Sequence, residues 1–219
     1  AGGALLETRT QASIDKGALK ATRTRTLGAI PLASAPASSP SEEEAIALVA
    51  EHLAARGLGD LGWGKEASSL RERMRVLHEV LGDPWPDVSD EALAGSVHEW
   101  LAPWAKRLAQ GGSLSSVPML DALRSMLPWP QAARLDELAP EKMPIPAGGT
   151  RPIDWSGAHP VLTLRVQQAF GWTDTPRLVD GRVPLVLHLT DPAGRPAAVT
   201  SDLTSFWAGP YRDVRAQLR

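Results

Sequence analysis

The stretch GRVPLVLHLTDPAGRPAAVTSDLTSFW, residues 181–207, decides the fold of the C-terminal part of this 219-residue chain. Its Val- and Leu-rich beginning predicts a strand from Val183 to Thr190. The sequence DPAG at 191–194 is typical of a turn, and Ala197–Thr200 predicts a second strand after it. A final helix is expected to begin near Asp202. The stretch therefore predicts a β-hairpin followed by a helix.

Upstream of this hairpin, Pro and Gly residues between 144 and 149 break the chain. A short strand is expected at Arg151–Trp155 and a helix at Val161–Phe170, with Pro160 in its first turn and Gly171 at its end. Residues 147–219 are therefore predicted to form a β-α-β-β-α unit.

The middle of the chain reads as helical. After a linker at 33–40 (ASAPASSP), Ser41 and Glu44 form a capping box for a helix that ends at Gly57. A second helix carries apolar residues from Leu70 to Leu81, and a third extends from Ser89 to Trp104, where Pro103 is expected to end or kink it. Weaker helical patterns follow at 117–127 and 130–138. These five helices predict an all-helical domain over residues 35–146.

The first 34 residues predict strands. Residues 7–13 and 18–26 flank a turn signal at Asp15-Lys16-Gly17, and LGAIPL at 27–32 predicts a third strand. Two or three strands cannot bury a core alone. They are therefore expected either to pair with the C-terminal strands or to be the tail of a domain that begins before Ala1. The fold class predicted for the whole chain is α+β.

Composition restricts the functional classes. The chain has no cysteine, no apolar run long enough for a membrane helix and no secretory signal, so we expect a cytoplasmic protein with no membrane partner. Residues 33–150 hold ten basic and seventeen acidic side chains, whereas both flanking parts are mildly basic. All eight basic residues after position 150 are arginine, which is suited to bidentate phosphate contacts.

No catalytic, cofactor-binding or metal-binding residues are expected in this chain. The segment GDLGWGK at 59–65 matches the opening of a P-loop, but Glu66 stands where Ser or Thr must hold magnesium, and a helix precedes it instead of a strand. The five histidines lack metal-ligand spacing, and no GxSxG nucleophile motif is present.

Eight tryptophans are an unusual number for this length. Trp85, Trp100, Trp104 and Trp129 lie in or beside apolar stripes and are expected in the core. Three lie nearer to loops and arginines, where packing is the favoured role and stacking on bases the alternative: Trp63, Trp172 and Trp207.

Residues 181–207, extended upstream by HPVLTLRVQQAFGWTDTPRLVDGR at 159–182, resemble the C-terminal signature of the HrpB family of bacterial ATP-dependent helicases in the DEAH-box group. LGAIPL and the segments 68–104 and 127–149 agree more loosely. The resemblance implies a non-catalytic accessory region whose partner in cis is a helicase motor core. The two RecA-like motor domains, which bind ATP and magnesium, are then expected before Ala1, and a basic tail after Arg219.

The accessory region is expected to help the motor core hold single-stranded RNA or DNA. The candidate contact residues are Arg165, Arg177, Arg182, Arg195, Trp207, Arg212 and Arg215. Alternatively, Arg182 and Arg195 brace the hairpin through carbonyls or through Asp191 and Asp202. The alternative function is a protein-interaction or structural module that docks through the acidic helical domain. The choice between RNA and DNA and the oligomeric state stay open from sequence.

Overall fold

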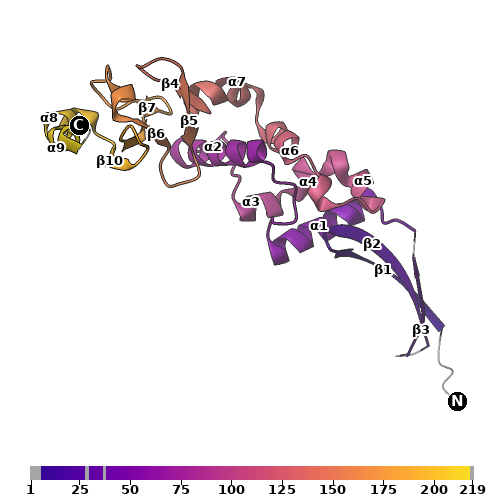
Figure 1. The fold of residues 1–219 in the computed structure, drawn as a ribbon. Helices are drawn as coiled ribbons and strands as arrows, with labels where there is room; N and C mark the ends of the chain where they lie inside the picture. The colour runs from indigo at the N-terminus through magenta and orange to yellow at the C-terminus, as the bar shows by residue number, and fades with distance from the viewer. Residues whose placement is uncertain (1–5, 28–29, 37, 218–219) are drawn as a thin grey trace. The chain divides into compact units, whose positions relative to one another are not determined.

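The computed structural model describes residues 6–27, 30–36 and 38–217. Contacts divide the chain into two units, Ala1–Ser68 with Asp87–Met126, and Ser69–Pro86 with Leu127–Arg219. The division falls within helix α2 (Lys65–Leu81) (Figure 1). These units cut across the predicted segments 1–34, 35–146 and 147–219, so the three-segment organisation stays a prediction.

An antiparallel sheet of three strands opens the first unit, in the order β1 (Leu6–Asp15), β2 (Ala18–Leu27) and β3 (Ile30–Pro36). Lys16 and Gly17 connect β1 to β2 with φ of 50° and 74°, as a two-residue hairpin turn of the mirror-image type requires. These strands pair with one another, and the expected pairing with the C-terminal strands is wrong for the described residues. β3 also extends over the first part of the predicted linker, because its backbone pairs with β2 as far as Pro36.

The turn of this hairpin packs on the helices of the same unit. Leu114 donates its backbone N–H to the carbonyl of Gly17 at 2.7 Å, and Ala18 forms a bridge with Ser113. Leu19 is only 3% exposed. One end of the hairpin therefore obtains its burial from the helical part of the chain.

Helix α1 (Glu42–Arg56) begins and ends where the sequence predicts. Ser41 Oγ accepts from the Glu44 N–H, and the Glu44 carboxylate accepts from the Ser41 N–H, so both halves of the capping box form. Gly57 ends the helix with a φ of 76°. The buried face comprises Ala45, Val49 and Leu53.

The single helix predicted from Ser89 to Trp104 is wrong. The chain forms α3 (Asp90–Gly95), α4 (Val97–Trp100), the 3-10 turn η1 (Ala102–Trp104) and α5 (Ala105–Ala109). Ser96 leaves helical geometry between α3 and α4, with φ −107° and ψ 21°, and Pro103 has no N–H to continue α4. The 3-10 turn η2 (Leu114–Ser116) and α6 (Met119–Met126) complete the unit.

The second unit is built on a five-stranded mixed sheet in the order β10-β9-β6-β5-β4. Its strands are β4 (Lys142–Pro144), β5 (Thr150–Asp154), β6 (Val161–Arg165), β9 (Val186–Thr190) and β10 (Pro196–Thr200). β6 and β9 are parallel, and the other pairs are antiparallel. A two-stranded ribbon of β7 (Arg177–Leu178) and β8 (Val183–Pro184) precedes β9.

The helix predicted at 161–170 is wrong. Val161–Arg165 forms the central strand β6, and only the 3-10 turn η3 (Val166–Ala169) follows it. Along β6 the side chains of Leu162 and Leu164 are buried while those of Thr163 and Arg165 are exposed, the two-residue period of a strand. The C-terminal part is therefore not the predicted β-α-β-β-α unit, although the α+β class is confirmed.

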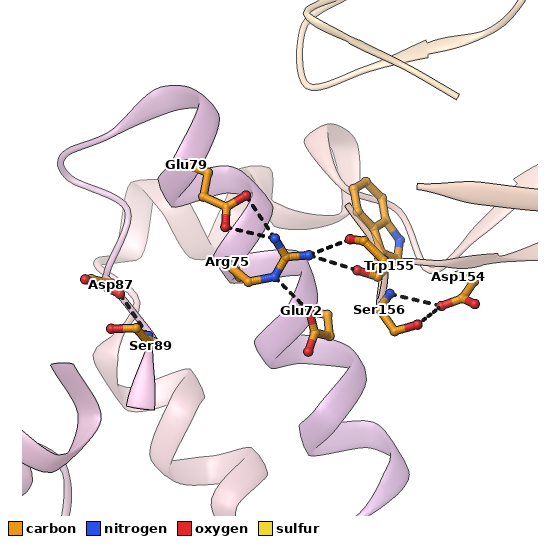
Figure 2. Close-up of polar contacts among 9 residues, drawn as sticks. Glu72, Arg75, Glu79, Asp87, Ser89, Asp154, Trp155 and Ser156 are labelled. Carbon is orange, nitrogen blue, oxygen red and sulfur yellow. Dashed lines mark hydrogen bonds and ion pairs between the residues drawn. The ribbon is translucent and has the colours of Figure 1, made fainter. Parts of the chain in front are cut away.

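The C-terminal half of α2 is joined to the loop after β5 through Arg75 (Figure 2). Its guanidinium binds Glu72 and Glu79 on α2 and donates to the carbonyls of Trp155 at 3.2 Å and Gly157 at 2.9 Å. Helix α7 (Trp129–Leu138) belongs to the same unit. Trp129 at its start is 82% exposed, so its expected place in the core is wrong, whereas Trp85 and Trp100 are buried.

The final helix is divided into α8 (Leu203–Ala208) and α9 (Tyr211–Gln217). Asp202 begins α8 as predicted, since its carboxylate accepts from the Ser205 N–H at 3.0 Å. Gly209 and Pro210 separate the two helices, because proline cannot continue the hydrogen-bond ladder of α8.

Candidate nucleic-acid interface

The predicted arginines fall into two groups, those bonded within the fold and those that are exposed without a partner. Arg195 belongs to the first group. Its Nε donates to Asp191 Oδ2 at 2.7 Å and its backbone N–H to Asp191 Oδ1 at 2.9 Å, across the turn between β9 and β10. The predicted alternative for Arg195, a brace to Asp191, is therefore present.

Arg177 braces the ribbon of β7 and β8, whereas the brace that was expected from Arg182 on the β9–β10 hairpin is not formed among the described residues. Arg177 Nε donates to the carbonyl of Gly181 at 2.6 Å, while the exposed Arg182 side chain forms no hydrogen bond with the residues that the structure describes. The reason is the turn itself, in which Val179, Asp180 and Gly181 all have positive φ and direct the Gly181 carbonyl to Arg177. The brace proposed for Arg182 is therefore wrong.

Arg165, Arg212 and Arg215 are exposed, and their side chains have no hydrogen-bond or ion-pair partner among the described residues. Arg165 ends β6. Arg212 and Arg215 lie on α9 on either side of the buried Val214 in the sequence. Exposed guanidiniums without a carboxylate partner are available for phosphate oxygens.

Trp207 lies in an aromatic cluster with Phe170, Phe206 and Tyr211. Its ring centroid is 5.8, 5.0 and 5.1 Å from theirs, respectively. Its indole N–H donates to the carbonyl of Trp172 at 2.9 Å, and the side chain is half-buried. These contacts fix Trp207 as the packing centre of the cluster.

Phe170 is the exposed member of this aromatic cluster, and the sequence reasoning did not choose it as a site residue. It is 46% exposed, and its ring lies 5.9 Å from that of Tyr211 in an edge-on arrangement. The sequence analysis placed it at the end of the predicted helix 161–170, which the structure does not form. The signal that could have identified it is the Gly171 that follows, with a φ of 112°.

The P-loop-like segment at 59–65 does not fit a nucleotide phosphate. It lies between helices α1 and α2, and the Glu66 carboxylate occupies the first turn of α2. A Cβ at Gly62 would be 2.2 Å from the Ser115 carbonyl oxygen, so a carbonyl approaches the loop where a phosphate-binding loop offers N–H groups. Within the described part of the chain, no cluster of three or more His, Cys, Asp or Glu side chains could hold a metal ion.

No helix in the described residues combines the length and apolar character needed to cross a bilayer.

Comparison with known proteins identifies the class to which this fold belongs. A family described as the C-terminal region of ATP-dependent helicases, HrpB_C, matches residues 100–219, more than half of the chain. The chain belongs to this family, as the sequence resemblance predicted.

The individual relatives are from Escherichia coli. The chain is 35% identical over 206 residues to the ATP-dependent RNA helicase HrpB of strain K12, covering 93% of this chain and 26% of that protein. The crystal structure of E. coli DExH-box NTPase HrpB matches with a TM-score of 0.73 and 32% identity, over 98% of this chain and 27% of that one. A crystal structure of E. coli DEAH/RHA helicase HrpB matches with a TM-score of 0.71 and 33% identity. The chain thus spans about a quarter of the length of the relatives it matches.

Proposed function

We propose that this chain is the non-catalytic C-terminal accessory region of an ATP-dependent helicase and that its second unit helps the motor core to hold nucleic acid. The family membership and the relative named an RNA helicase support the first part. ATP and magnesium would be bound by motor domains elsewhere in the parent protein. RNA is the ligand to test first, with DNA as the comparison.

The observation that carries the nucleic-acid role is the exposure of arginines in the second unit whose side chains have no partner in the described part of the chain. They are Arg165, Arg182, Arg212 and Arg215. By contrast, Arg73, Arg75 and Arg134 in the same unit each bind carboxylates. An unpaired guanidinium in water is ready to exchange its counterion for a phosphate.

The test is a binding titration of the chain with fluorescein-labelled single-stranded RNA and DNA at several salt concentrations. Reversing two charges on α9 (Arg212→Glu with Arg215→Glu) is expected to weaken binding and to reduce the log–log salt slope by roughly 1.4, about 0.7 for each lost phosphate contact. The control variant, Arg56→Glu with Arg124→Glu, changes the net charge equally at exposed positions of the first unit.

The two double variants separate a local contact from a general effect of charge. Weak binding only in the α9 variant supports the proposal. Equal weakening in both variants contradicts it, because net charge alone would then account for the attraction. Equal affinity of the α9 variant and the unmodified chain would place the contact elsewhere, and the N-terminal hairpin would then be the next candidate.

A second candidate function is protein docking through the first unit. A groove of about 370 Å³ is lined mainly by apolar residues of α1 and the α3–α4 junction: Glu43, Ile46, Ala47, Ala50, Gly95, Val97 and His98. A contact of this kind would persist at high salt because apolar burial does not release counterions. Ala47→Arg should then abolish association with the motor core added in trans, while Arg212→Glu with Arg215→Glu should leave it unchanged.

A further inference from the structure

Phe170 is held by its neighbours in an exposed position. Trp207 and Tyr211 contact its ring at centroid distances of 5.8 and 5.9 Å, yet 46% of the residue remains accessible to solvent. Trp207 is fixed in turn by the bond from its indole N–H to Trp172. The cluster therefore presents one flat aromatic face to solvent on a packed support.

The backbone around Phe170 is fixed as well. The Arg165 N–H donates to Gln168 Oε1 at 3.1 Å at the start of η3, and the Phe170 N–H donates to the Gln167 carbonyl at 3.4 Å at its end. Gly171 then takes a φ of 112°, and a Cβ at this position would lie 3.0 Å from Pro146 Cβ. The ring is therefore presented by a defined turn on a packed backbone.

Two exposed arginines lie near Phe170 along the chain or next to a residue that contacts it. Arg165 precedes η3, roughly 10 Å from Phe170 at about 2 Å per residue of 3-10 helix. Arg212 directly follows Tyr211, whose ring contacts Phe170. Both arginines are exposed, and their side chains have no partner among the residues that the structure describes.

We propose that Phe170 stacks on an unpaired base while Arg165 and Arg212 contact the neighbouring phosphates, so that the ligand of this surface is a single strand with accessible bases. The inference rests on the proposed function and deepens it. Phosphate contacts alone do not distinguish a single strand from a duplex, whereas an aromatic side chain can reach the face of a base only where that base is unstacked.

The experiment compares three oligonucleotides with the 219-residue chain: single-stranded RNA, the same backbone with abasic sites, and blunt duplex RNA. Phe170→Ala is expected to weaken single-strand binding roughly 5- to 150-fold, the usual range for a stacked base, with the salt slope unchanged. It is expected to leave binding to the abasic strand and the duplex unchanged.

Further variants separate stacking from folding. Phe170→Leu retains apolar bulk but should lose affinity as Phe170→Ala does, whereas Phe170→Tyr should retain affinity because the aromatic face persists. Trp129→Ala removes another exposed aromatic side chain of the same unit, 82% accessible, and should change nothing. Thermal unfolding checks that each variant is folded. A strand carrying 2-aminopurine should lose fluorescence on binding to the unmodified chain and less on binding to Phe170→Leu.

The remaining outcomes distinguish failure of the stacking inference from failure of the proposed function. Single-strand binding that is unchanged in both Phe170→Ala and Phe170→Leu, or equal for abasic and base-containing strands, overturns the stacking inference and leaves the phosphate contact of the proposed function intact. An equal loss in Trp129→Ala also overturns it. Absence of saturable binding to any oligonucleotide overturns both.

Discussion

Arg195 binds Asp191 twice, through the side-chain Nε at 2.7 Å and through the backbone N–H at 2.9 Å. The Asp191 side chain is 13% exposed, while that of Arg195 is 78% exposed. The backbone N–H of Arg195 lowers the pKa of Asp191 below its usual range, burial opposes this effect, and the Arg195 side chain adds to it. The pair closes the turn between β9 and β10, so the Arg195 side chain is already bonded within the fold.

This pair predicts a pH-dependent contribution to stability. Because the pKa of Asp191 is lower in the folded chain than in the unfolded chain, the stabilisation is complete above the unfolded value of about 4 and disappears as pH falls through the folded value. Asp191→Asn should therefore lower the urea midpoint at pH 7, and the difference from the unmodified chain should shrink towards pH 3. A difference that stays constant with pH would contradict an ionised Asp191.

Trp100 is expected to dominate the core of the first unit. It is 1% exposed, and its indole N–H donates to the Leu93 carbonyl at 2.9 Å. Trp100→Ala should reduce the free energy of unfolding by roughly 3–5 kcal/mol, measured by denaturant titration. Trp129→Ala, at an 82% exposed position, is the matched control and should change it by less than about 0.5 kcal/mol. Equal effects of the two substitutions would be inconsistent with their burial.

Two glycines of one loop should respond differently to the same methyl group. A Cβ at Gly62 would lie 2.2 Å from the Ser115 carbonyl oxygen, whereas a Cβ at Gly64 would meet nothing within 4 Å. Gly62→Ala should cost about 1–3 kcal/mol of unfolding free energy because backbone must shift to admit the methyl group. Gly64→Ala should be close to neutral. Equilibrium denaturant titration of the two variants measures both changes. Equal effects would contradict packing of this loop on residues 115–117.

The chain is expected to show no saturable binding of labelled ATP and no ATP hydrolysis. Glu66, in the first turn of α2, stands where a P-loop has the Ser or Thr that holds magnesium, and its carboxylate would repel a nucleotide phosphate. Isothermal titration with Mg-ATP should therefore give only the heat of dilution. Saturable binding that Lys65→Ala abolishes would contradict this expectation.

Much of the local structure could be predicted because it depends on the chemistry of a few adjacent residues. The capping box of Ser41 and Glu44, the end of α1 at Gly57 and the start of α8 at Asp202 are all confirmed. The site was predicted less completely. The sequence indicated which residue types could contact phosphate, and it favoured Trp207 as a stacking candidate because that residue lies near loops and arginines, whereas the exposure of Phe170 became visible only in the structure. Whether any of these residues contacts nucleic acid stays a prediction.

By itself, the sequence determined the caps, the hairpin turns, the α+β class and the family, because each depends on residue identity at short spacings. Only the tertiary structure decided that Val161–Arg165 is a central strand, since the preference of this segment is settled by the two strands that pair with it. It also decided which arginine side chains already have hydrogen-bond partners within the fold. Arg177 and Arg182 lie on either side of the β7–β8 turn, but among the described residues it is Arg177 that donates to the Gly181 carbonyl. The partner of each arginine depends on the backbone conformation of the turn beside it, which places the acceptor oxygen, and residue type alone does not determine that conformation.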